Sequence, residues 1–396
     1  MINKKITYIS KYLEIPTEKS FGSRGYHLIE NLENTQNTII TSNSNHLLKD
    51  PKSEKKNGKS NIIILSCIGF KESISLRRIL SWIEFEIKLF FQLHFKLPKQ
   101  DIIICSIPSI FSILNGLIYK LIYKSKLVFE VRDIWPLTLV EVGGFSKFNP
   151  LILVLSFIET LGYKFSDLIV GTMPNLQEHV QNKIGFRNNI ITVPQGVSAL
   201  QIERQANSDL KIQIDNKKKN ICYAGTIGIS NHIEDILKLA KSLEKNCDIH
   251  FHFFGKGDKV DLIKNTGLSN VSYWGVIDRN QVISTLSKFD FLIFSTSKDS
   301  LFKYGQSLNK LIDYMLANKP VIAMYDGYES MLNESKGGKY FKHDDFEGIL
   351  KYIYSNPSDI KSKDWVMKNR NFRVLAKNYE LALNSLFNGK NEFDYD

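Results

Sequence analysis

Cysteine is scarce in this sequence, and its arrangement excludes two kinds of structural site. The 396 residues include four cysteines, which are widely spaced along the chain: Cys67, Cys105, Cys222 and Cys247. The spacing matches neither a zinc site nor a disulfide framework, and the first three cysteines lie within apolar runs. We therefore expect reduced core cysteines in a cytosolic protein.

Long apolar runs and metal-ligand clusters are also missing. No stretch of eighteen or more apolar residues escapes interruption by charge, so the sequence predicts no membrane-spanning helix. The first ten residues lead directly into a strand pattern and lack the apolar core and cleavage site of a secretory signal. His250 and His252 share one strand face without a third ligand nearby, so packing against a helix is favoured over metal binding.

Length and charge indicate two domains, with an anionic partner for the first. A chain of 396 residues is too long for one ordinary core. Residues 1–200 contain 24 Lys and Arg against 16 Asp and Glu, whereas the remainder contains 28 against 25. The net charge of +11 is therefore concentrated in the first half. This favours nucleic acid, an acidic membrane surface or a phosphorylated substrate as the partner.

Strand-like apolar runs alternate with helix-length segments in both halves of the chain. The runs of the first half cover residues 6–10, 38–41, 62–66, 102–106, 127–131, 168–171 and 190–193. After a polar stretch around 206–219, the pattern restarts with runs over 220–224, 249–255, 271–274, 289–295 and 321–324. This alternation predicts two doubly wound α/β domains, each a parallel sheet wrapped by helices. We expect the first over residues 1–200 and the second over 201–363.

The stretch 306–322, QSLNKLIDYMLANKPVI, predicts a helix with a functional polar side. Ser307 is placed to cap this helix near its start, and the segment 318–320 ends it before a buried strand. Asn309, Lys310 and Asp313 share one side of the first turns, opposite an apolar stripe. At a helix N-terminus these groups suit a nucleotide's phosphate and ribose hydroxyls. A merely solvated polar face is the alternative.

Two glycine turns follow strands at the same edge of the second predicted sheet. Gly225 and Thr226 begin a turn before a helix that Asn231 is placed to cap, and Lys256 lies in the next turn. Such turns let backbone N–H groups approach a diphosphate, and ligands of parallel sheets bind beyond the carboxyl ends of the strands. Gly225, Lys256 and Lys310 are therefore expected around one anion. An exposed turn lysine is the alternative for Lys256.

The first domain carries a dense charged motif, FEVRDIWP, where a buried strand ends. Glu130, Arg132 and Asp133 at this position predict the rim of a ligand cleft, because buried charge is costly elsewhere. Gly22 and Arg24 lie in another loop that follows the first strand and leads into a helix. The alternative is an ion pair of Arg132 with Glu130 or Asp133 that only positions the loop.

These motifs carry a resemblance to a known family. YAGTIG, FGKGD and above all SLNKLIDYMLANKPVI resemble the nucleotide-binding half of family-4 glycosyltransferases of the GT-B fold. VRDIWP and GSRGYHL resemble the first-domain signatures of the branch that includes bacterial L-fucosamine transferases of O-antigen and capsule assembly. The resemblance implies two Rossmann-like domains facing a central cleft. It also implies a helix over 364–387 that packs back on the first domain, before a tail over 388–396.

The resemblance implies a role for several positions. Asp313 stands where the family's second acidic residue meets the ribose, and Lys310 where a side chain reaches the diphosphate. Gly225 and Thr226 match the loop under the phosphates. The donor set is completed by Lys256 and Asn309. Catalytic roles are expected for Asp133, which would orient or deprotonate the acceptor hydroxyl, and for Arg132, with Gly22, Arg24 and Glu130 on the acceptor side.

The chain also departs from the family pattern. Many members place a glutamate eight positions before the second acidic residue, whereas this sequence has Gly305 there. The Arg and Lys pair that usually follows the glycine loop is not evident, and Lys256 and Lys303 are its possible substitutes. The groups that contact the sugar and clamp the phosphates are thus the least defined part of the expected site.

An aromatic and basic segment over residues 76–97 predicts contact with a membrane surface. It contains Trp82, Phe85, Phe90, Phe91 and Phe95 flanked by arginines and lysines, as suits a helix lying on anionic lipid. A second basic aromatic run follows over 107–126. The alternative is that both are core helices of the sheet domain. We expect a peripheral protein at the inner, cytoplasmic face of the cytoplasmic membrane, with a lipid-linked acceptor.

Together these features predict a metal-independent, retaining glycosyltransferase of bacterial surface polysaccharide synthesis. The nucleotide sugar, UDP-linked by family analogy, is a substrate, and no cofactor is expected. A nucleotide-sugar epimerase of the same fold is one alternative, and it would convert donor without any acceptor. A basic nucleic-acid-binding protein is the other, but no recognised binding motif is present, so no nucleic-acid partner is expected.

Overall fold

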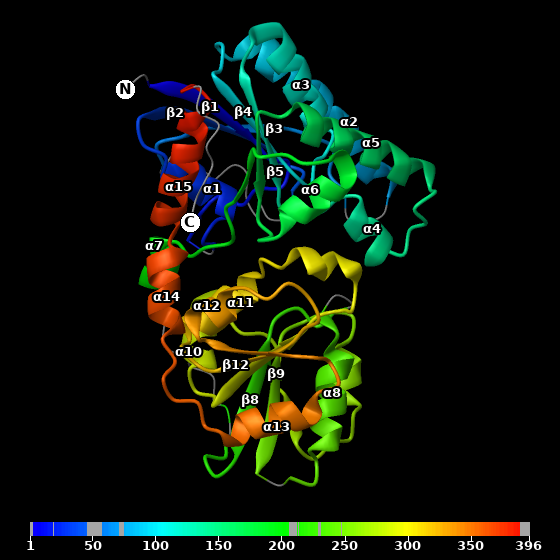
Figure 1. The fold of residues 1–396 in the computed structure, drawn as a ribbon, viewed down its shortest axis with the longest axis vertical. Coiled ribbons are helices and arrows are strands. Elements are labelled where there is room, and N and C mark those ends of the chain that lie inside the picture. The colour runs from blue at the N-terminus through cyan, green and yellow to red at the C-terminus, as the bar shows by residue number, and fades with distance from the viewer. Residues whose placement is uncertain are drawn as a thin grey trace. The chain divides into compact units, whose positions relative to one another are not determined.

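The computed structural model describes residues 3–18, 20–45, 58–70, 75–205, 212, 214–228, 231–246 and 248–388. Cys247 and the expected tail from residue 389 onward lie outside these ranges. The chain divides into two compact units, one of Met1–Pro194 with Phe372–Asp396 and the other of Gln195–Asn371 (Figure 1). The first boundary therefore falls a few residues before the expected one at residue 200.

The first unit is built on a parallel sheet with the strand order β3-β2-β1-β4-β5-β6-β7. The strands are β1 (Lys4–Ile9), β2 (Thr35–Ser42), β3 (Asn61–Leu65), β4 (Ile102–Ser106), β5 (Lys126–Val131), β6 (Leu168–Gly171) and β7 (Ile190–Thr192). The helices are α1 (Arg24–Glu30), α2 (Leu76–Phe91), α3 (Ser112–Tyr123), α4 (Leu137–Glu141), α5 (Pro150–Phe165), α6 (Leu176–Ile184) and α15 (Phe372–Ser385), and a π-helical turn, Gln92–Lys96, continues α2.

The second unit repeats this plan with the strand order β10-β9-β8-β11-β12-β13. Its strands are β8 (Lys219–Ala224), β9 (Ile249–Phe254), β10 (Val271–Tyr273), β11 (Phe291–Ser295), β12 (Val321–Met324) and β13 (Gly338–Phe341). Its α-helices are α7 (Ala199–Glu203), α8 (Ile233–Ser242), α9 (Val260–Lys264), α10 (Val282–Leu286), α11 (Asn309–Leu316), α12 (Met331–Ser335), α13 (Phe346–Tyr354) and α14 (Ser362–Asn369). Short 3₁₀ turns cover Arg279–Gln281 and Ser300–Tyr304.

The prediction of two doubly wound α/β domains is confirmed. Central strands such as β4, with the sequence IIICS, are buried along their whole length, which is why they appear as unbroken apolar runs. The segment expected as one helix over 364–387 is two helices instead. α14 packs against α11 of the second unit, whereas α15 packs against α1 and contributes Phe372, Leu375 and Tyr379 to the core of the first (Figure 1).

Candidate functional site

The second unit contains a cavity of about 460 Å³ at the carboxyl edge of its sheet. The six residues that the sequence predicted for the donor all line it: Gly225, Thr226, Lys256, Asn309, Lys310 and Asp313. They come from the ends of β8 and β9 and from the first turns of α11. Residues that the sequence reasoning missed, Asn231 and Arg279 among them, complete the walls.

The two glycine turns pack backbone against backbone. A Cβ atom on Gly255 would lie 1.8 Å from the carbonyl oxygen of Gly225, so no larger residue fits between the turns. The backbone N–H of Gly225 donates to the Phe254 carbonyl at 3.1 Å, and that of Ile227 to the Lys256 carbonyl at 2.9 Å. These two N–H groups are therefore engaged within the protein, contrary to the expectation that the Gly225 turn offers them to a phosphate.

Lys310 supplies the positive charge beside the glycine turn. Its Cε and Nζ atoms would lie 3.3 Å from a Cβ atom on Gly225, so the amine stands directly over the turn. The amine donates to the hydroxyl of Tyr223 at 3.1 Å and to the side-chain oxygen of Asn231. Burial lowers the pKa of Lys310 to about 7. Among the residues that the structure describes, no carboxylate pairs with it.

The sequence predicted that Asn231 caps α8. It does not, because its side chain binds Lys310 instead. The residue before α8 is His232, whose side chain makes no capping hydrogen bond. Ser307 likewise does not cap α11, since its hydroxyl accepts the backbone N–H of Gln195 at 2.8 Å. In both cases a partner distant in sequence has displaced the local cap.

Asp313 is buried on the cavity wall and already paired. Its side chain is 7% exposed, and it forms an ion pair with both terminal nitrogens of Arg279. Gln201 donates a further hydrogen bond at 3.0 Å. Burial raises the pKa of Asp313, while the charge and hydrogen bonds of Arg279 and the hydrogen bond from Gln201 oppose the rise. A ribose would therefore meet this carboxylate in competition with Arg279.

Arg279 follows β10, the third strand whose end meets the same edge of the sheet. Its position after a strand end could have identified Arg279 as a cavity residue, but no recognisable sequence motif surrounds it. Lys303, proposed as a substitute clamp, does not line the cavity and lies over the ring of Tyr304 at 4.8 Å. Gly305 has a φ of 89°, a backbone conformation that disfavours the glutamate that the family resemblance would place there.

The charges that line the cavity do not balance. Within the described part of the chain, Lys256, Arg279 and Lys310 face it with Asp313 as the only carboxylate. When Lys310 is protonated, an anion with two negative charges would neutralise this excess, which is the charge of a diphosphate esterified at both ends. The cavity can therefore hold a diphosphate next to Lys310 and hydroxyl groups next to Asp313.

Tyr314 ties α11 to the strands that form the cavity floor. Its hydroxyl accepts the backbone N–H of Ala224 at 2.8 Å and lies 3.2 Å from the Ile293 carbonyl. Because Tyr314 follows Asp313 and Ala224 precedes Gly225, these bonds fix both walls of the cavity. The sequence reasoning missed this residue, since a tyrosine within an apolar stripe resembles any core aromatic residue.

Replacing Tyr314 with phenylalanine is expected to lower the free energy of unfolding by about 1 to 2 kcal/mol, because the Ala224 N–H loses its buried partner. Urea unfolding of the variant measures the loss. Tyr352→Phe on α13 is the control, because the Tyr352 hydroxyl makes no hydrogen bond to any described residue. Equal stability of the two variants would contradict the role given to Tyr314.

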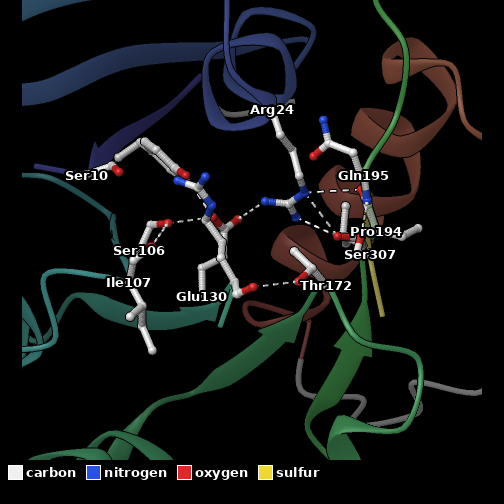
Figure 2. A network of polar contacts seen from close by, with 12 residues as sticks. Ser10, Arg24, Ser106, Ile107, Glu130, Thr172, Pro194, Gln195 and Ser307 are labelled. Carbon is white, nitrogen blue, oxygen red and sulfur yellow. Dashed lines mark hydrogen bonds and ion pairs between the residues drawn. The ribbon is translucent and has the colours of Figure 1, made fainter. Parts of the chain in front are cut away.

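In the first unit, Arg24 and Glu130 form a buried ion pair. Their side chains are 2% and 0% exposed, and a nitrogen of Arg24 lies 3.0 Å from the Glu130 carboxylate. Tyr8 and Ser106 donate to the same carboxylate at 2.7 and 2.8 Å. Figure 2 shows the guanidinium of Arg24 between Glu130 and the carbonyl of Pro194, to which it donates at 3.1 Å.

This network gives Arg24 and Glu130 a structural role inside the unit, while their acceptor-side role stays a prediction. Burial alone would raise the pKa of Glu130, but the charges of Arg24 and Arg132 and the hydrogen bonds of Tyr8 and Ser106 lower it. Both side chains are therefore buried and engaged with each other inside the unit. Gly22 is likewise explained by the backbone, since its φ is 78° and a Cβ atom would lie 2.6 Å from Pro16.

Asp133 is half-buried and lies just after the end of β5. Its carboxylate accepts the hydroxyl of Thr138 at 2.6 Å and the indole N–H of Trp135 at 3.1 Å, which fixes its orientation just before α4. Arg132 is half-buried, and its carbonyl accepts the hydroxyl of Thr172 at 3.0 Å. The alternative ion pair of Arg132 with Glu130 does not form, because Arg24 takes that place.

The two histidines of β9 are satisfied within the sheet. His252 lies 3.0 Å from the side-chain oxygen of Asn220 and accepts the indole N–H of Trp274 at 3.0 Å. Burial, and next the charge of His250, lower its pKa to about 3. Within the described ranges, no group of three or more His, Cys, Asp or Glu residues is arranged to hold a metal ion. In the same ranges no helix is long and apolar enough to cross a bilayer.

Comparisons with known proteins identify the fold. No protein-family model matches the sequence, and no curated protein matches it. Among solved structures, sucrose-phosphate synthase from Thermosynechococcus elongatus is similar with a TM-score of 0.71 and 13% identity, over 98% of this chain and 100% of that one. The Anabaena protein HepE in complex with UDP-glucose is also similar, with a TM-score of 0.61 and 12% identity. The match covers 97% of this chain and 100% of that one.

The lipopolysaccharide outer core galactosyltransferase WaaB is also similar, with a TM-score of 0.62 and 15% identity over 96% of this chain and 99% of that one. At these identities the likeness shows the fold alone. The chain has the GT-B fold, with two parallel-sheet α/β units of the kind found in these proteins.

Proposed function

We propose that this protein is a glycosyltransferase that moves a sugar from a nucleoside diphosphate sugar to an acceptor. The observation that carries the proposal is the cavity of the second unit, where Lys310 lacks an acidic partner among the described residues beside a glycine turn. The structural likeness to WaaB and to HepE with UDP-glucose supports the same function.

The donor would bind with its diphosphate at Lys310 and Lys256 and its ribose hydroxyls at Asp313. When the bond to the sugar breaks, the departing diphosphate gains negative charge, and the two lysines would stabilise that charge. The lysines thus act on the leaving group, so the reaction needs no strong base in this unit. Asn309, at the exposed start of α11, would contact the donor from the same side as Lys310.

The acceptor would bind to the first unit near Asp133. The carboxylate is held by Thr138 and Trp135, and it would orient or deprotonate the acceptor hydroxyl, with Arg132 beside it. We further propose a retaining, metal-independent transfer and a uridine nucleotide, three features that rest on the family resemblance alone.

The acceptor is proposed to be lipid-linked and the protein to work at the cytoplasmic face of a membrane. Half-exposed apolar side chains on α2, including Ile79, Ile83 and Ile87, support this proposal together with the basic residues of that helix. A role in bacterial surface polysaccharide synthesis, as in O-antigen or capsule assembly, would follow from such an acceptor.

A screen of UDP-, GDP- and dTDP-sugars for thermal stabilisation tests the proposed function. A ligand that binds only the native protein raises its melting temperature, and we expect a UDP-sugar to give the largest shift. If no nucleotide sugar shifts the melting temperature, the proposal is wrong. Conversion of the donor without any acceptor would instead identify an epimerase.

A further inference from the structure

Three neighbouring helices of the first unit, α2, α3 and α5, carry apolar side chains that are exposed to solvent. Ile79, Ile83, Ile87 and Phe91 repeat every four residues along α2, and each is about half exposed. Helix α3 contacts both α2 and α5 (Figure 1). All three helices bear exposed apolar residues. An apolar face that extends over three helices of a folded chain marks a binding surface.

A groove of about 540 Å³ lies within this face. Its walls include Ile83, Ile87 and Phe91 of α2, Leu114 and Ile118 of α3, and Leu151 of α5. The polar side chains at the groove form hydrogen bonds with other protein side chains. Glu86 accepts the hydroxyls of Ser109 and Ser112 at 2.7 Å each and the amide of Asn115 at 2.8 Å, and burial raises its pKa. The walls are left apolar, which suits a hydrocarbon chain.

One end of the groove leads to the candidate acceptor residue. Trp82 lines the groove, and its ring centre lies 6.0 Å from that of Trp135. The indole N–H of Trp135 donates to Asp133. Arg78 lies over the ring of Trp82 at 5.1 Å and places a positive charge at the same end. Trp82 of the apolar groove therefore has a cation beside it and, through Trp135, a carboxylate close by.

We propose that this groove holds the hydrocarbon tail of the acceptor, with the phosphate that joins tail to sugar at Arg78 and the sugar toward Asp133. The inference rests on the proposed transferase function for its assignment of Asp133. A lipid-linked saccharide carries the matching groups, an apolar tail, a phosphate and a sugar. A second copy of the chain fits less well, because the basic residues Arg77, Arg78 and Lys96 of the two copies would repel.

Single-chain alkyl phosphates, used as dissolved monomers, test this proposal in the absence of membrane. Calorimetry with hexyl, octyl and decyl phosphate is expected to show one site per chain. Affinity is expected to rise roughly fourfold for each added methylene, the value for transfer of a methylene out of water. Inorganic phosphate, which lacks a tail, is the control for binding by the head group alone.

A matched pair of double variants locates the site. Ile83→Gln with Ile87→Gln replaces two groove residues, and Leu121→Gln with Ile122→Gln replaces two residues of α3 outside the groove. All four are more than half exposed, with values of 52%, 54%, 80% and 58%, so both variants should fold. The groove variant is expected to lose at least about tenfold in decyl phosphate affinity, while the α3 variant keeps it.

Three results would overturn the proposal. The first is that monomeric alkyl phosphates do not bind. The second is that their affinity does not depend on chain length, and the third is that the two double variants lose affinity equally. Conversion of a dimer to a monomer by the groove variant alone, seen by light scattering, would assign the face to a second copy instead. UDP-glucose binding by the same proteins reports separately on the donor site, so failure of the groove is distinguishable from failure of the transferase function.

Discussion

The variant in which Lys310 is replaced by methionine is expected to lose nucleotide binding and to melt at a higher temperature than the parent. Binding is lost because the diphosphate no longer meets the cation over Gly225. Truncating one partner of such a charge pair costs about 2 to 5 kcal/mol, which is at least about thirtyfold in UDP-glucose affinity. Stability rises because the protein without nucleotide no longer buries a charged amine for which the described residues offer no acidic partner.

The pH dependence follows from the same residue. Burial lowers the pKa of Lys310 from 10.5 to about 7, so the folded state binds this proton less tightly than the unfolded state. The destabilisation is fully present below about pH 7 and fades as the pH rises toward the unfolded value. The methionine variant should therefore gain most in melting temperature below pH 7 and little in alkaline buffer.

Melting curves from pH 6 to pH 9, with and without UDP-glucose, measure both effects. The parent should also bind UDP-glucose less tightly as the pH rises above about 7, because Lys310 loses its charge, whereas the variant should show no such trend. Lys351→Met is the control, since Lys351 is an exposed partner of Glu347 on α13. A Lys310→Met protein that UDP-glucose stabilises as strongly as the parent would remove this residue from the donor site.

The strands were predictable because buried parallel strands form unbroken apolar runs. The run over 102–106 matches β4 residue for residue, and the other predicted runs agree to within a few residues. β13 was missed because its sequence, GKYF, is short and half polar. Residues at strand ends were also predictable, since parallel strands bring their carboxyl ends to one edge, and this placed Gly225 and Lys256 around one cavity.

Side-chain pairing was beyond the sequence because it depends on residues distant along the chain. Charge at the end of β5 was expected to mark a cleft, but Glu130 is neutralised by Arg24, which follows β1, two positions from β5 in the sheet order. A carboxylate at a strand end can be buried with three partners or exposed at the rim of a cleft, and the sequence does not distinguish these two arrangements. The cap residues failed for the same reason, since Lys310 and the Gln195 backbone hold Asn231 and Ser307.

Arg279 is expected to affect a nucleotide and its nucleoside in opposite ways. Arg279 neutralises Asp313, so ribose hydroxyls would compete with it for the carboxylate. A diphosphate offers the guanidinium a second anion in the same cavity and thereby releases Asp313. Arg279→Ala should therefore lower UDP affinity by about tenfold to a hundredfold, the contribution of a charged hydrogen bond, while uridine binds at least as tightly as before.

Asp313→Asn is the matched variant, because it keeps the shape of the side chain and removes the charge for which Arg279 and the ribose compete. Uridine affinity should fall in this protein, and UDP should lose less because Arg279 is left to the diphosphate. Calorimetric titration of UDP and uridine into both variants and the parent gives the affinity of each variant relative to the parent for each ligand. If each variant weakens both ligands by the same factor, the ion pair only shapes the wall of the cavity, and no exchange of Arg279 between carboxylate and phosphate takes place.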